Sequence, residues 1–153
     1  MQILASSDIS HVVVTHLHHL IALSIGAHRH AAATALSSVK SARLQAIKSD
    51  LVANFANPSL TVEQIAARHG VTARYVHKLF EREATTYTQF ILRLRLECAN
   101  RMLRDQRIIT RSITSIAYDV GFSDLSYFNR AFRRHYNATP SYLRKQAAEA
   151  RSE

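Results

Sequence analysis

The sequence is poor in the residues that sheets, disulfide frameworks and cysteine-based metal sites require. Its 153 residues include three glycines, two prolines and one cysteine, and no tryptophan. A sheet of many short strands needs more turn-forming residues than this, so an all-helical chain is predicted. A single cysteine excludes an internal disulfide and a cysteine-rich zinc site, and it is typical of a reducing compartment such as the cytoplasm.

Acidic residues are also scarce. Eleven Asp and Glu stand against twenty Lys and Arg, which gives a net charge of +9 at pH 7. A chain this basic is expected to bind a polyanion, either nucleic acid or an anionic membrane surface. Fifteen basic and seven acidic side chains fall within residues 60–145, so the excess charge is concentrated there.

Residues 9–27 are the one apolar stretch to weigh as a membrane span. The stretch contains four histidines and lacks the basic flank of a signal peptide. We therefore expect no membrane association and interpret it as a buried helix, capped by Ser7 or Asp8 and ending near Gly26. A second helical pattern ends at Asn57-Pro58 and has its apolar residues three and four apart, at Leu44, Ile47, Leu51, Val52 and Phe55.

Beyond Pro58 the pattern is that of a helix-turn-helix over about residues 61–83. Thr61 and Gln64 form a capping box at a helix start, and Gly70 marks the turn that follows. The second helix is predicted to be capped by Thr72. It would bury three apolar side chains, Val76, Leu79 and Phe80.

The same pattern recurs 51 residues later, over about residues 112–136. Five residues match in order: Ile65, Ala66, Gly70, Val71 and Thr72 correspond to Ile116, Ala117, Gly121, Phe122 and Ser123. Beyond them the offset becomes 52, which indicates one extra residue in the second turn. Val76, Leu79 and Phe80 then correspond to Phe128, Ala131 and Phe132.

A long helix over residues 87–105 is predicted to join the two units. Its buried side would carry Ile91, Leu94, Cys98 and Met102. At 1.5 Å per residue it spans roughly 28 Å. With the widths of the two units added, this is of the order of the 34–36 Å or so between successive major-groove faces of DNA. One chain is therefore expected to read two adjacent major grooves.

The residues expected to contact DNA follow from the phase of the second helix of each unit, because those opposite the core face outward. Arg and Lys can donate to guanine, Asn can pair with adenine, and apolar groups can touch thymine methyls. Lys78, Arg133 and Arg134 could instead anchor phosphates. The predicted DNA-binding residues are Ala73, Arg74, His77 and Lys78 in the first unit and Asp124, Leu125, Ser126, Asn129, Arg130 and Arg133 in the second.

Over roughly residues 44–145 the chain resembles the DNA-binding domain of the AraC/XylS family of bacterial transcription regulators. The resemblance rests on Ile65-Ala66 with Gly70-Val71-Thr72, the segment Leu94–Glu97, and above all residues 116–124, 127–134 and 139–141. It implies a two-unit domain that binds double-stranded promoter DNA, usually as an activator, and that can act on RNA polymerase.

The resemblance also suggests a domain organisation. Residues 41–146 would form the DNA-binding domain, and residues 147–153 a disordered tail. Family members usually carry a long sensor domain first, so residues 1–40 are interpreted as its terminal helices in a truncated or short form. Their apolar face predicts homodimer formation through residues 1–40.

Other classes of function fit less well. The chain has no glycine-rich phosphate loop, paired carboxylates or activated nucleophile, so it is not expected to be an enzyme or to use a cofactor. The histidines at 16, 19, 28 and 30 lack a cysteine or carboxylate nearby, so no metal site is expected. The remaining alternative is a basic helical module that binds an acidic partner in the transcription machinery.

Overall fold

The computed structural model describes residues 34–108 and 110–149, and within these ranges the chain is helical with no strand, as predicted. The chain divides into two compact units, residues 1–43 and 44–153. Of the first unit, residues 34–43 are described, and they are helical. The predicted helix near the N-terminus, its histidines and the last four residues lie outside the described ranges.

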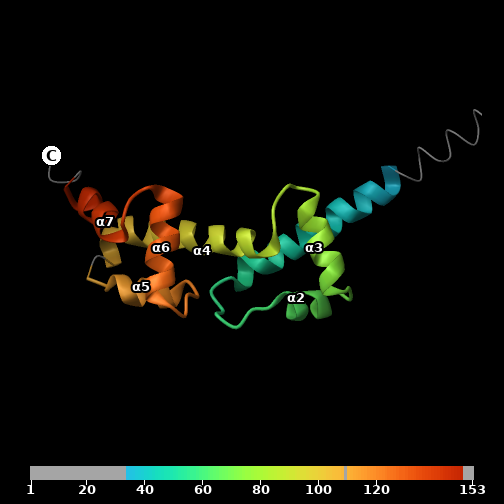
Figure 1. The fold of residues 1–153 in the computed structure, drawn as a ribbon, viewed down its shortest axis with the longest axis horizontal. Helices are drawn as coiled ribbons and strands as arrows, with labels where there is room; N and C mark the ends of the chain where they lie inside the picture. The colour runs from blue at the N-terminus through green and yellow to red at the C-terminus, as the bar shows by residue number, and fades with distance from the viewer. Residues whose placement is uncertain (1–33, 109, 150–153) are drawn as a thin grey trace, which may run out of the picture. The chain divides into compact units, whose positions relative to one another are not determined.

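The first lobe of the second unit surrounds one apolar core. It comprises the helical residues 44–54, α2 (Val62–Arg68), α3 (Ala73–Glu81) and the first half of α4 (Tyr87–Arg104) (Figure 1). Leu44, Ile47 and Leu51, three apolar residues of the predicted helical pattern, are buried in it. Val52, a fourth residue of that pattern, is 51% exposed. A helix turns by about 100° per residue, which rotates Val52 away from the core that Leu51 faces.

The helix-turn-helix of this lobe has the predicted local contacts. The Thr61 hydroxyl accepts from the Gln64 amide at 3.3 Å, and the Gln64 side chain accepts from the Thr61 amide at 3.2 Å. Gly70 has φ +61°, a conformation that favours glycine. The chain then re-enters the core at Val71, whose amide donates to Ala66 at 2.9 Å. Thr72 caps α3.

The second lobe repeats this arrangement with α5 (Ile113–Asp119) and α6 (Leu125–Tyr136), to which α7 (Pro140–Glu149) is added. A short 3-10 turn, Gln106–Ile108, follows α4. The turn glycine, Gly121, lies 51 residues after Gly70, whereas the cap of α6 is Asp124, 52 residues after Thr72. The extra residue therefore lies in the turn, and the match of Ser123 with the capping Thr72 is corrected.

The linker helix α4 serves both cores. Tyr87, Phe90 and Ile91 are buried in the first core, whereas Leu96, Ala99 and Leu103 are buried in the second. The prediction of a single buried side is wrong in part, because Leu94, Cys98 and Met102 are only half-buried. Two lobes that pack on different faces of one helix spread its buried residues around the axis.

The side chain of Arg95 connects the lobes from the middle of α4. Its Nε donates to the carbonyl oxygen of Phe55 and its Nη2 to that of Asn57, both at 2.9 Å. The Phe55 ring packs against the second core. Burial lowers the pKa of the Arg95 guanidinium from its usual value. This contact holds the segment after residue 54 against the linker helix.

None of the helices within residues 34–108 and 110–149 is long and apolar enough to cross a membrane.

Candidate nucleic-acid interface

The recognition helix of the first lobe, α3, is oriented by three buried side chains. Val76, Leu79 and Phe80 face the core. On the opposite side Arg74, His77 and Lys78 are exposed, at the phase predicted from the sequence. Ala73 is half-buried and packs against the first core, so it offers less surface to a ligand than its three neighbours.

The recognition helix of the second lobe, α6, has the same orientation relative to its own core. Phe128, Ala131 and Phe132 are buried. The predicted residues on the other side are exposed, namely Ser126, Asn129, Arg130 and Arg133. Their equivalents in α3, at the 52-residue offset, are Arg74, His77, Lys78 and Glu81.

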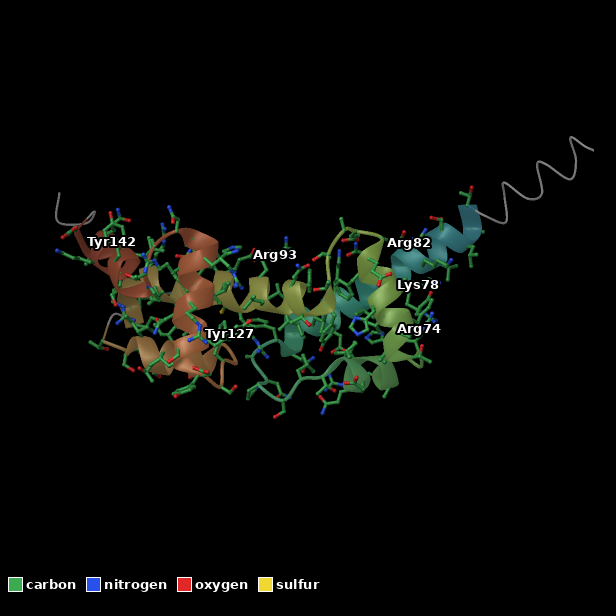
Figure 2. The ribbon with its side chains drawn as sticks, viewed as in Figure 1. Arg74, Lys78, Arg82, Arg93, Tyr127 and Tyr142 are labelled. Atoms are coloured by element: carbon green, nitrogen blue, oxygen red, sulfur yellow. The ribbon has the colours of Figure 1, made fainter. Side chains whose placement is uncertain are left out.

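Two predicted residues at the start of α6 also have structural roles. The Asp124 carboxylate accepts from the Tyr127 amide at 3.0 Å and caps the helix. Leu125 is half-buried and packs against the second core. Tyr127, which lies one position before the buried Phe128, is 41% exposed and faces away from α7 toward the first lobe (Figure 2).

Unpaired cations gather on the two recognition helices and at their ends. Elsewhere in the described chain half of the Lys and Arg side chains form ion pairs with acids, as in the pairs Arg68–Asp50 and Arg111–Asp119. Six cations form no ion pair with any of the described residues: Arg74, Lys78, Arg82, Arg130, Arg133 and Arg134. These guanidinium and ammonium groups remain available to phosphates or base edges.

Two outward residues on this surface, Glu81 and Arg82, are absent from the sequence prediction. Arg74, Lys78 and Arg82 follow one another along α3 at intervals of four (Figure 2), and Arg82 is the C-terminal cap of that helix. Glu81 lines a hollow of about 540 Å³ together with Arg74, His77 and Lys78. The sequence contained the signal for Glu81, because it lies seven residues after Arg74 and three after Lys78, on the same face of a helix.

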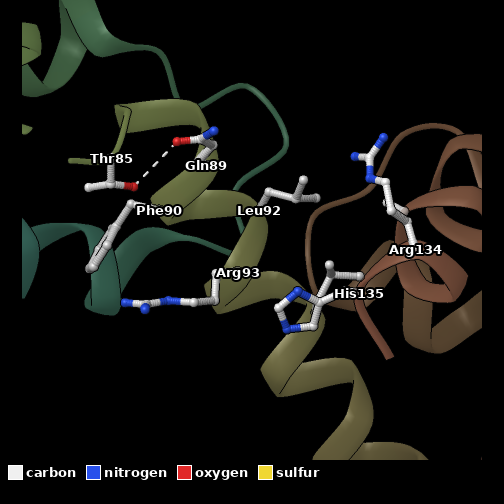
Figure 3. A pocket seen from close by; sticks show the side chains of 9 residues that line it. Thr85, Gln89, Phe90, Leu92, Arg93, Arg134 and His135 are labelled. Carbon is white, nitrogen blue, oxygen red and sulfur yellow. Dashed lines mark hydrogen bonds between the residues drawn. The ribbon is translucent and has the colours of Figure 1, made fainter. Parts of the chain in front are cut away.

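A groove of about 370 Å³ runs between the lobes beside α4 (Figure 3). Phe90 and Leu92 lie among its apolar lining, and Arg93, Arg134 and His135 add basic groups. Arg93 stacks over the Phe90 ring at 5.4 Å and pairs with Glu97 at 3.7 Å, so its charge is already partly neutralised. Arg134 is the unpaired cation of this groove.

A smaller pocket of about 240 Å³ lies where the first lobe meets Tyr127. Tyr87 lines it and is 6% exposed, and its hydroxyl has no hydrogen-bond partner among the described residues. Burial raises the pKa of Tyr87 to about 12. The hydroxyl is therefore neutral at physiological pH. In the described part of the chain no three His, Cys, Asp or Glu side chains gather in a way that could hold a metal ion.

Comparison with known proteins shows which proteins the chain is similar to. The model of a helix-turn-helix domain family matches residues 65–146. The transcriptional activator RhrA of Rhizobium meliloti is 43% identical over 108 residues, which are 71% of this chain and 34% of that protein. The transcriptional activator NphR of a Rhodococcus species is 36% identical over 95 residues, 62% of this chain and 28% of that protein. The chain thus spans about a third of the length of the curated relatives it matches.

A solved structure extends the similarity to the fold. An AraC-type transcriptional regulator from Chromobacterium violaceum is 30% identical, with a TM-score of 0.63. The alignment covers 72% of this chain and 96% of that one.

Proposed function

Since the chain belongs to the AraC/XylS family of helix-turn-helix transcription regulators, we propose that it binds promoter DNA sequence-specifically and activates transcription in the cytoplasm. The observation that carries the proposal is the paired arrangement of α3 and α6. Each helix buries one side in its own core and exposes groups suited to base edges on the other. The named activity of RhrA and NphR supports activation.

In this proposal the two recognition helices enter adjacent major grooves. The donors of Arg74, Lys78 and Arg130 are suited to guanine, and the amide of Asn129 is suited to adenine. Arg134, near the end of α6, is suited to hold phosphates, and Arg133 is suited to either a phosphate or a base edge. Because the exposed residues of α3 and α6 differ, the operator should be asymmetric within one footprint.

Two partners besides DNA belong to the same proposal. An activator acts on RNA polymerase, so a contact with polymerase is expected when the protein is bound upstream of a promoter. We also propose that the chain forms a homodimer through residues 1–40, whose apolar side chains need to be shielded from water. Sedimentation of the full chain as a monomer at roughly tens of micromolar would contradict the dimer.

The decisive experiment is selection of bound sequences from a pool of random DNA duplexes with the full chain. We expect enrichment of one asymmetric motif whose two parts lie about one helical turn apart. A gel-shift assay of the enriched duplex in the presence of heparin provides the control. Loss of all binding to heparin, with no enriched motif, would instead identify a basic module that binds polyanions without reading sequence.

A further inference from the structure

Glu81 occupies a position on α3 at which a carboxylate is unexpected. It is exposed, and it lines one hollow with Arg74, His77 and Lys78, the residues expected to meet DNA. Its phase is held by the buried residues of α3, notably Phe80 next to it. The equivalent position on α6, 52 residues later, is Arg133. The two recognition helices therefore carry opposite charges at the same place.

The carboxylate of Glu81 is not used within the described protein. Six other acidic side chains there form ion pairs with Lys or Arg, and Asp124 caps α6. Glu81 forms no ion pair in the same residues, although Lys78 lies one helical turn before it. Its oxygens are thus free to accept hydrogen bonds from a ligand.

The chemistry of DNA leaves few partners for such a group. An ionised carboxylate only accepts hydrogen bonds, and phosphates repel it. In the major groove guanine presents the acceptors N7 and O6, and thymine presents O4 and a methyl group. Adenine has an N6 donor, but its N7 acceptor lies beside it. Cytosine offers the N4 donor without that neighbouring acceptor.

We propose that Glu81 reads a cytosine in the half of the operator contacted by α3. This inference rests on the proposed DNA-binding function. The neighbouring cations of the hollow fit the same base pair, because Arg74 or Lys78 can donate to the guanine opposite or next to that cytosine. Since Arg133 replaces the carboxylate on α6, the half-site contacted by α6 has no corresponding preference.

The test compares sequence selection from random duplexes by the full chain and by two variants, Glu81→Ala and Glu81→Gln. The wild-type chain should enrich cytosine at one position in one half of the motif. Glu81→Ala should lose that preference, with about a tenfold loss of discrimination against the other bases. Glu81→Gln should shift the preference toward adenine, because an amide can pair with its N6 and N7.

The control is Glu149→Gln on α7, which also removes an exposed negative charge, here one paired with Lys145, and lies on neither recognition helix. It should leave every position of the motif unchanged. If Glu81→Ala enriches the same cytosine as the wild type, the inference about Glu81 is overturned while the DNA-binding function stands. If the wild-type chain enriches no motif at all, both are overturned. Unchanged thermal melting of the variants excludes unfolding as the cause.

Discussion

The turn glycine of the second lobe, Gly121, packs directly on the carbonyl oxygen of Ala56. A Cβ atom at Gly121 would lie 2.8 Å from that oxygen and 2.9 Å from the carbonyl oxygen of Phe55. Its φ of +91° also disfavours any side chain. The turn of the second helix-turn-helix is therefore part of the contact between the lobes. Gly70, its counterpart in the first lobe, has no atom of the described residues within 4 Å of the same position.

Replacement of each turn glycine by alanine should distinguish the energetic effect of backbone strain from that of steric overlap between the new Cβ atom and its neighbours. Gly70→Ala should lower the free energy of unfolding by about 1–2 kcal/mol, because only the left-handed backbone conformation is penalised. Gly121→Ala should lower it by about 3–5 kcal/mol, since the overlap with Ala56 adds to the strain. Urea denaturation of the two variants measures the difference. Equal losses would show that the contact with Ala56 relaxes at little energetic expense.

The outward arginines of the two recognition helices should affect binding without affecting stability. Arg74→Ala and Arg130→Ala should leave the free energy of unfolding within about 0.5 kcal/mol of wild type, because both side chains are exposed. Each should weaken binding at the selected operator by about 1–3 kcal/mol if a base contact is lost. Each should also relax the preference in one half of the motif only, as measured by fluorescence anisotropy on mutated duplexes.

The control for this pair is a buried residue of the same helix. Phe128→Ala should destabilise the fold by about 3–5 kcal/mol, because it removes a fully buried ring. An arginine variant that weakens binding equally on every duplex would identify that arginine as a phosphate anchor. Unfolding of both arginine variants, with Phe128→Ala stable, would show that the assigned helix phase is wrong.

Salt should weaken DNA binding steeply. If the six unpaired cations on and beside the recognition helices each displace one counterion from the DNA, whether they contact a base edge or a phosphate, the slope of log K against log salt should be about −5. Affinity should then fall by about a thousandfold between 50 and 200 mM salt. Lys78→Ala or Arg133→Ala should make the slope less steep by about 1. A flat response in a titration series would contradict a phosphate-based interface.

Removal of the unpaired hydroxyl of Tyr87 should stabilise the protein. Tyr87→Phe keeps the buried ring and eliminates a polar atom that has no partner among the described residues, so the free energy of unfolding at pH 7 should rise by about 1 kcal/mol. The folded pKa is raised from 10.0 to about 12. The unfolded chain therefore loses this proton first, and wild-type stability falls between pH 10 and 12.

Tyr87→Phe lacks this titration, so its advantage over wild type should grow across that pH range. Chemical denaturation of both proteins at pH 9, 10 and 11 measures the difference, and other titrating groups cancel in the comparison. A constant difference between the two proteins would contradict the raised pKa of Tyr87. A loss of stability at pH 7 would show that the hydroxyl has a hydrogen-bond partner in solution.

Local sequence determined the helices and the phase of the recognition surfaces. Capping at Thr61 and Thr72, the glycine turns and the spacing of Val76, Leu79 and Phe80 are all decided within a few residues. Interactions between residues this close in the chain can be predicted from the sequence alone. Each helix forms its own backbone hydrogen bonds, and its apolar residues recur at the helical period. The exposure of Arg74 and Arg130 follows directly from that period.

Tertiary structure decided how these units share the linker helix. The exposure of Val52, the half-burial of Leu94 and the contact of Gly121 with Ala56 depend on which lobe packs on which face of α4. Contacts between residues far apart in the chain determine these features, and no local sequence pattern determines the angle between the two lobes. The isolation of the Glu81 carboxylate was decided in the same way, because it depends on which acids the folded chain brings to its cations.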